Sequence, residues 1–221
     1  MKTSVRASRA ATRPDWWYRE TLSSTAVALA VAVLGAVLIG GLTSFGKQYL
    51  PAWLNSLANS AGGWTMFSFL LVWLGRARPL LAAVLGVLVF QLLVEAYSVV
   101  SEWRGFPDGD PFSSIWTLVG LVCGPLLGAT ASLTRYGSPL WRVLAVTPLG
   151  AVLLGEGVYG LIAIADTTSP VYWYLEIVLG VAFIVIANIR HSLPWRQVLL
   201  VEGVWLGGSA GFLWFYLVGL N

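Results

Sequence analysis

Long apolar stretches separated by short polar segments fill most of this chain. They fall at residues 22–43, 62–75, 79–101, 113–134, 141–164, 171–189 and 196–219. Most of them approach the twenty or so apolar residues that a helix needs to cross the hydrocarbon of a bilayer. The pattern predicts an all-α integral membrane bundle of seven transmembrane helices. The second stretch is short, so six spans are the alternative, with 51–55 as a candidate interfacial or re-entrant helix that leads into it.

Composition agrees with that assignment. Of the 221 residues 57% are hydrophobic and only 10% are charged, whereas soluble domains carry about a quarter charged residues. The net charge of +3 does not indicate a nucleic-acid partner, because the basic residues sit at the ends of the apolar stretches. We expect a basic cytoplasmic tail over 1–21 and one transmembrane domain over 22–221.

Arginines alternate along the polar segments. Pairs at 76 and 78, 135 and 142, and 190 and 196 occupy every second connection, whereas most acidic residues outside the spans lie in the other connections. Because short cytoplasmic loops carry an excess of Lys and Arg, the chain is predicted to cross the cell membrane several times. The N-terminus should be cytoplasmic and, with seven spans, the C-terminus external.

Three acids lie well inside apolar stretches: Glu95, Glu156 and Glu176. Hydrocarbon disfavours an ionised carboxylate, so such residues usually face a bundle interior and mark a functional site. A rise of 1.5 Å per residue puts Glu95 and Glu156 about 25 and 21 Å from the arginines that begin their spans, and Glu176 about 10 Å below the outer turn. We therefore expect all three around one cavity in the outer half of the membrane, with Glu202 on another level.

Aromatic residues accompany these acids. Helical spacing places Tyr159 one turn after Glu156 and Tyr172 one turn before Glu176. We expect the three acids to be catalytic and the following side chains to bind substrate: Trp64, Tyr97, Trp116, Tyr159, Tyr172, Trp173, Trp205 and Phe212. An alternative is that the acids form a structural hydrogen-bond network between helices.

Small residues recur at every fourth position of three stretches, a pattern that lets helix backbones approach closely. The three sets are Ala28, Ala32, Ala36 and Gly40; Gly120, Gly124 and Gly128; and Gly203, Gly207 and Gly211. They predict a compact bundle and indicate no particular activity.

The combination of isolated acids and aromatic rings narrows the chemistry. Magnesium-dependent prenyl chemistry needs clustered aspartates, and only Asp108-Gly-Asp110 comes close, so we expect neither metal nor cofactor. A carboxylic acid kept protonated by apolar surroundings can donate its proton to an alkene, and aromatic faces stabilise the resulting carbocation. The sequence therefore predicts proton-initiated, metal-independent cyclisation of a prenylated substrate that enters from membrane lipid, with a prenylated indole as one option.

Two resemblances accompany this interpretation. The run Gly155-Glu156-Gly-Val-Tyr159-Gly, followed by Asp166-Thr-Thr-Ser-Pro170-Val-Tyr172-Trp173 and Glu176, resembles a family of small multi-spanning actinobacterial membrane proteins of unassigned function, over most of the chain from about residue 35. In plan the chain also resembles bacterial membrane-bound terpene cyclases of drimentine-type pathways. The second likeness implies a terpene cyclase, and no site residue above is carried over from either family.

Two other functions fit the same residues. A transporter or substrate-binding membrane subunit for a small solute would also use acids inside the membrane, and the small residues from Ala28 to Ala36 resemble the docking face of substrate-binding components in energy-coupling-factor transporters. A structural or assembly subunit is the third interpretation. The sequence does not identify the substrate or the oligomeric state.

Overall fold

The computed structural model describes residues 20–106, 110 and 112–219. The tail expected over 1–21 lies outside the described residues except for Glu20 and Thr21. Within the described part every regular element is helical: α1 (Leu22–Tyr49), η1 (Asn55–Asn59), α2 (Ala61–Gly75), α3 (Pro79–Trp103), α4 (Ile115–Tyr136), α5 (Pro139–Leu144), α6 (Thr147–Ala163), α7 (Pro170–His191), α8 (Trp195–Trp214) and η2 (Phe215–Gly219).

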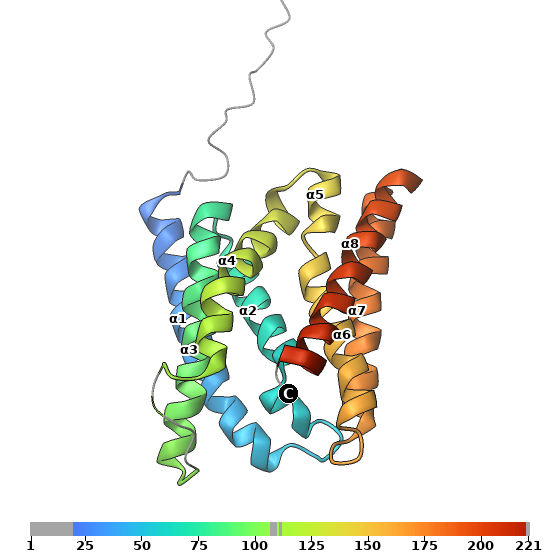
Figure 1. Cartoon of the computed structure of the whole chain (residues 1–221). Coiled ribbons are helices and arrows are strands. Elements are labelled where there is room, and N and C mark those ends of the chain that lie inside the picture. The colour runs from blue at the N-terminus through green and yellow to red at the C-terminus, as the bar shows by residue number, and fades with distance from the viewer. Residues whose placement is uncertain (1–19, 107–109, 111, 220–221) are drawn as a thin grey trace, which may run out of the picture.

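Among the described residues, six helical segments are long and apolar enough to cross a membrane: α1, α3, α4, the combined α5 and α6, α7, and α8 with η2. The all-α membrane bundle predicted from the sequence is therefore confirmed. The short second stretch is α2, which has 15 residues and is about 22 Å long, less than the roughly 30 Å of hydrocarbon. Between α1 and α2, a loop followed by η1 carries the chain into the bundle (Figure 1).

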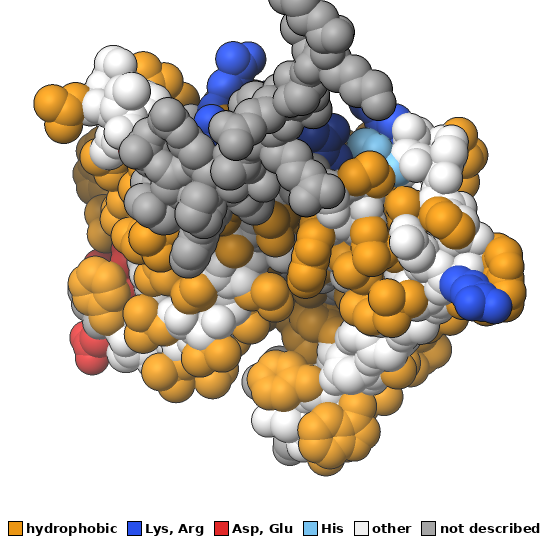
Figure 2. Space-filling model, turned by 90° about the horizontal axis from the view of Figure 1, so that it is seen from above, with side chains coloured by type: hydrophobic (Ala, Val, Ile, Leu, Met, Phe, Trp, Pro, Cys, Tyr) orange, Lys and Arg blue, Asp and Glu red, His pale blue; other side chains and the backbone are white. Residues whose placement is uncertain are grey.

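Arginines gather at one end of the bundle, which we call the basic end. They lie at or beside the ends of α2, α4 and α7 and the starts of α3, α5 and α8: Arg76, Arg78, Arg135, Arg142, Arg190 and Arg196. Figure 2 looks down on this end and shows basic side chains on its rim. The alternation of arginine-bearing connections in the sequence therefore corresponds to one face of the fold.

The bundle consists of two halves joined through α2. In the first half α3 packs between α1 and α4, and in the second half α6 packs between α7 and α8. Figure 1 shows α2 between these two groups. A Cβ at Gly128 of α4 would collide with the carbonyl oxygen of Ala82 on α3, so the glycines of α4 are what allow these backbones to touch.

The three small-residue stripes do not all pack. Those of α1 and α4 face neighbouring helices, as predicted, with Ala28, Ala32 and Ala36 almost fully buried. The third stripe faces outward, because a Cβ at Gly203, at Gly207 or at Gly211 would meet nothing within 4 Å. Spacing alone does not distinguish a packed glycine stripe from an exposed one.

Proline divides the fifth predicted span into α5 and α6. Pro148 has no N–H, and its ring would collide with the carbonyl of Leu144 in a continuous helix. α5 accordingly ends at Leu144, α6 begins at Thr147, and the Thr147 hydroxyl donates to the Leu144 carbonyl at 2.8 Å.

Candidate functional site

The start of α2 lies inside the bundle and needs hydrogen-bond acceptors there. The first four N–H groups of a helix have no partner within it, and an unpaired one is costly away from water. Ala61 donates to Glu156 Oε1 at 2.9 Å, and Gly62 donates to Glu156 Oε2. Gly63 donates to the hydroxyl of the capping residue Ser60 at 2.8 Å. The Glu156 carboxyl group thus caps α2 from another helix, at the positive end of its dipole.

A second acid completes this polar centre. Glu176 Oε1 accepts from the hydroxyl of Tyr172 at 2.7 Å and from that of Ser60 at 2.9 Å. The same Ser60 hydroxyl lies 3.1 Å from Glu156 Oε2 and 2.7 Å from the Tyr172 oxygen. We call Ser60, Glu156, Tyr172 and Glu176 the acid cluster. Ser60 bridges its two carboxyl groups.

The acid cluster is closed to solvent. Glu156 is 4% and Glu176 2% exposed. A Cβ added at Gly62 would lie 2.9 Å from Glu156 Oε2 and would collide with Glu176 Oε1. The second oxygen of Glu176 is buried and has no hydrogen-bond partner among the described residues. Glycine at position 62 therefore provides the space that both carboxyl groups occupy.

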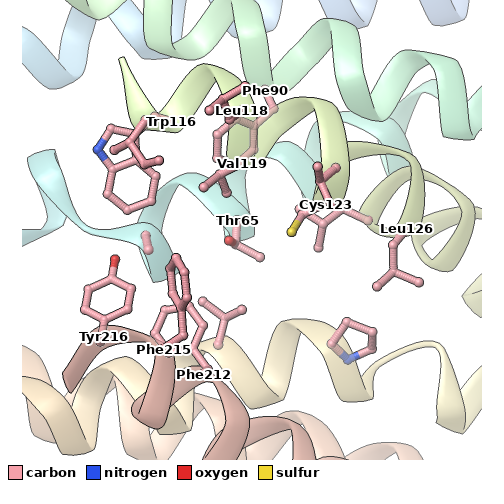
Figure 3. A pocket seen from close by; sticks show the side chains of 16 residues that line it. Thr65, Phe90, Trp116, Leu118, Val119, Cys123, Leu126, Phe212, Phe215 and Tyr216 are labelled. Atoms are coloured by element: carbon pink, nitrogen blue, oxygen red, sulfur yellow. The ribbon is translucent and has the colours of Figure 1, made fainter. Parts of the chain in front are cut away.

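An apolar cavity of about 520 Å³ lies between α4 and the second half of the bundle. Its walls come from α2, α3, α4, α6, α8 and η2, and they carry several aromatic rings: Phe90, Trp116, Phe212, Phe215 and Tyr216. In Figure 3 the rings of Phe212, Phe215 and Tyr216 lie across the cavity from Trp116 and Cys123. We call this space the lateral cavity.

The lateral cavity opens on the flank of the bundle. Leu118, Val122 and Leu126 of α4 line it and are 60%, 76% and 54% exposed. The lone cysteine of the chain, Cys123, is exposed beside them and also lines the cavity. In a membrane, this opening would face lipid chains rather than water.

The wall of the lateral cavity adjoins the acid cluster at α6 and at Ala61. Pro148 and Val152 line it from α6, and Glu156 follows at the same spacing of four on that helix face. Ala61 also lines it and is the residue whose N–H binds Glu156. Neither carboxyl group is itself part of the wall. Glu156 therefore lies behind the part of the wall that Ala61 forms.

The structure brings together two of the three predicted acids. Glu156 and Glu176 lie at one level, as their positions along the helices indicated. The expectation that Glu95 joins them is wrong: its carboxylate accepts from the backbone N–H of Phe112 at 3.1 Å, in the segment before α4. Glu202 lies nearer the basic end, where it accepts from the side chain of Asn188 at 3.1 Å, so it is on another level as expected.

Two predicted aromatic residues, Trp116 and Phe212, line the lateral cavity. Trp64 lies behind Trp116, with ring centroids 5.5 Å apart, and Tyr97 packs on Trp64 at 5.8 Å. Tyr159 packs on Tyr216, a residue of the cavity wall, at 5.0 Å. These three form a second layer around the cavity.

The other three predicted aromatic residues lie elsewhere. Tyr172 belongs to the acid cluster, and Trp173 packs edge-on against it at 4.9 Å while donating to Thr168 at 2.9 Å. Trp205 does not reach the cavity; it packs with Val143 in the apolar core of the second half. Trp205 faces α6, because a Cβ at Gly150 would lie 3.2 Å from its ring nitrogen, and its predicted role in substrate binding stays a prediction.

Sequence reasoning missed Ser60 and Tyr216. Ser60 directly precedes the apolar run of α2, and serine in that position is a common helix cap, so its place at a helix start could have been predicted. Its role as a bridge between two acids depends on α6 and α7 and carries no local signal. Tyr216 follows Phe212 at a spacing of four, and the two rings stack with centroids 4.6 Å apart.

No curated protein and no solved structure matches this chain. A family model described as a family of unknown function, DUF6518, matches residues 19–219. This match agrees with the predicted resemblance to multi-spanning membrane proteins of unassigned function and does not bear on the resemblance to terpene cyclases. The chain belongs to the DUF6518 family.

Proposed function

We propose that this protein binds an apolar, prenyl-type molecule in the lateral cavity and cyclises it by acid initiation. One observation carries the proposal: the helix faces that line an aromatic cavity lead to a buried pair of carboxyl groups. The remaining features of the site support this combination in turn.

The cavity favours a lipid-soluble ligand. Its wall is formed almost entirely of aliphatic and aromatic side chains, with Thr65 as a rare polar member. A ligand dissolved in the bilayer can enter sideways past Leu118 and Val122. The rings of Trp116, Phe212 and Tyr216 can stabilise a carbocation by cation–π attraction, worth about 2 kcal/mol each when desolvated. Burial also keeps water from quenching the cation early.

The acid cluster can store a proton. Two carboxyl groups that share one hydroxyl away from water do not readily both ionise, so we propose that the pair holds one proton. Glu156 faces backbone N–H groups, which suit a carboxylate. The unpaired oxygen of Glu176 is less unfavourable as a neutral O–H than as an ionised atom. Ser60 can pass the proton between them.

The proposed reaction conserves every atom of the substrate. Because Ala61 separates the cavity from Glu156, the terminal alkene of the substrate must extend past Ala61 to reach the acid. The O–H bond of Glu156 in its protonated form breaks, and the proton adds to that alkene. The cation that forms is attacked by the next alkene, which closes a ring. Loss of a proton from a neighbouring carbon to the Glu156 carboxylate forms the final alkene and restores the acid. The net change is an isomerisation.

The experiment is incubation of membranes containing the full chain with a farnesylated indole, followed by mass spectrometry of the products. Glu156→Gln keeps the shape but removes the acid, so turnover should fall by a factor of about 100 or more. Glu95→Gln is the matched control, because it removes a membrane acid outside the acid cluster. Full turnover by Glu156→Gln would exclude the mechanism.

Cavity occupancy can be measured without chemistry. Cys123 is the sole cysteine of the chain and lines the lateral cavity, so its alkylation by a maleimide reports access. The farnesylated indole should slow this alkylation in the wild-type chain and in Glu156→Gln alike. An unchanged alkylation rate at saturating ligand would contradict binding in this cavity.

We also propose that the basic end is cytoplasmic, as the arginine distribution favours. The N-terminus is then inside the cell and the C-terminus outside. Reporters fused to the C-terminus test this topology: phosphatase activity outside the cell is expected. Strong cytoplasmic fluorescence of a C-terminal fusion would contradict it.

Proton-coupled transport is a second candidate, favoured by one feature. The acid cluster links the halves of the bundle, since Ser60 precedes α2 whereas both acids come from α6 and α7. A change in its protonation could therefore alter how the halves pack. Proteoliposomes distinguish the two functions: a transporter would move the labelled ligand in response to a pH gradient and leave it chemically unchanged.

A further inference from the structure

A second cavity lies between the halves and opens at the basic end. It has a volume of about 590 Å³ and is enclosed by α2, α4, α5, α6 and α7. Four basic side chains line it: Arg135, Arg142, Arg190 and His191. Among its described lining residues none is acidic. We call this cavity the basic groove.

The arginines of the basic groove come from three helices, and two of them donate to neutral acceptors. Arg135 of α4 donates to the backbone oxygen of Trp73 at 3.2 Å, and its guanidinium lies 4.4 Å from the centre of that ring. Its Nε atom is buried and has no hydrogen-bond partner among the described residues. Arg142 of α5 donates to the carbonyl of Gly137 at 2.8 Å. These contacts orient the charges without neutralising them.

Positive charge accumulates at this mouth. Arg142 of α5 and Arg190 of α7 both line it, with His191 next to Arg190, so guanidinium groups from two helices face the same space. Like charges that face one space repel each other, and an anion bound between them would replace this repulsion with attraction. Arginine is well suited to phosphate, because its planar fork can donate two parallel hydrogen bonds.

Below the mouth the basic groove becomes apolar. Its deeper lining includes Met66, Phe69 and Leu70 of α2 and Phe183 of α7. From Trp73 to Met66 the groove follows α2 for about 10 Å. A free phosphate ion would occupy only the mouth and leave this part unfilled. A phosphate that carries hydrocarbon chains would contact both parts.

We propose that the basic groove binds an anionic membrane phospholipid, with the phosphate between the arginines and an acyl chain between α2 and α7. Basic pockets between transmembrane helices are recognised sites for acidic lipid headgroups. This site is separate from the lateral cavity and the acid cluster, so the proposal does not depend on the proposed cyclisation.

The test is native mass spectrometry of the purified full-length protein in detergent with equal amounts of phosphatidylglycerol and phosphatidylcholine. The wild-type chain should retain phosphatidylglycerol, and the triple variant Arg135→Gln, Arg142→Gln, Arg190→Gln should bind it about tenfold or more weakly, a loss of about 1.4 kcal/mol. The matched control, Arg76→Gln, Arg78→Gln, Arg196→Gln, removes the same charge at the same end outside the groove.

The control should retain the lipid as the wild type does. Equal loss in both triple variants would overturn the proposal, because it would mean that net charge alone attracts the lipid. Equal retention of phosphatidylcholine by the wild type would overturn it too.

A second variant tests the apolar part and keeps every arginine. Ala187→Trp places a large ring in the groove beside α7 and should also weaken lipid binding about tenfold, with the thermal midpoint of the lipid-free protein measured as the check on folding. Competition with inorganic phosphate tests whether the groove prefers a phospholipid or a free phosphate ion. Displacement of the lipid by phosphate at equal concentration would show that the site takes a free ion, and would overturn the proposal.

Discussion

Glu156 and Glu95 are both glutamates inside apolar helices, yet their surroundings differ. Glu156 is 4% exposed and accepts hydrogen bonds from Ser60, Ala61 and Gly62. Glu95 is partly exposed and accepts one backbone bond from Phe112. The surroundings of each acid therefore depend on the segment that its carboxyl group faces. Glu156 faces the start of a short internal helix, whereas Glu95 faces a connecting segment.

Among the variants that test this comparison, Gly62→Leu is expected to cause the largest loss of folded protein. The added side chain would collide with the carboxyl groups of Glu156 and Glu176 and force the two halves apart, since buried networks and overpacked cores give the largest losses of stability. We expect no folded protein by fluorescence-detected size-exclusion chromatography. Gly203→Leu is the control, because a Cβ there meets nothing within 4 Å. Normal recovery of Gly62→Leu would contradict the described geometry.

Glu156→Leu is expected to have the next largest effect. It leaves the N–H groups of Ala61 and Gly62 without an acceptor, at about 1–3 kcal/mol for each group. The thermal midpoint in detergent should fall by ten degrees or so, at about 2–4 °C per kcal/mol for a chain of this size. Glu95→Leu is the control and should change the midpoint by less than half as much. Equal changes would mean that the two acids are equivalent.

These two experiments also indicate what the sequence could and could not predict. The apolar lengths predicted the helices, and the rise per residue predicted that Glu156 and Glu176 share a level. The same rise failed for Glu95, because height along a helix does not specify which half of the bundle the helix belongs to. The meeting of Ser60 with both acids depends on α2, α6 and α7 together, and no local pattern encodes such an arrangement.

The break between α5 and α6 has a local signal in the sequence. Thr147-Pro148 in the middle of the fifth apolar stretch marks the break between α5 and α6, because proline removes a helical hydrogen bond. Gly203, Gly207 and Gly211 show what a local pattern does not predict. Their spacing equals that of the packed glycines of α4, yet they face outward, so periodicity identifies a face without identifying its neighbour.

Ser60→Ala is expected to have an intermediate effect. It removes the cap on Gly63 and the bridge between the two acids, and loss of a helix cap costs about 1 kcal/mol. We expect the thermal midpoint to fall by about 2–4 °C. Ser60→Thr keeps a hydroxyl at the same position and should recover most of the loss. A Thr variant no better than the Ala variant would show that the hydroxyl is not the stabilising group.

Glu95→Gln should have the smallest effect. The amide oxygen of glutamine can still accept from the N–H of Phe112, and changes outside the core usually stay within about 0.5 kcal/mol. The thermal midpoint should stay within about 2 °C of the wild-type value. A larger fall would place Glu95 among the structurally important acids, and the contrast with Glu156 would disappear.

The cap on α2 has a consequence for how the chain is made. Ala61 and Gly62 leave the ribosome before the helix that supplies their acceptor, since Glu156 lies 95 residues after Ala61. Until α6 and α7 are inserted, the start of α2 has no acceptor from them and gains by staying near headgroup water. We therefore expect α2 to take its final depth only late in biogenesis, so that a ribosome stalled before α6 would leave position 61 accessible to a water-soluble thiol reagent in an Ala61→Cys, Cys123→Ser chain.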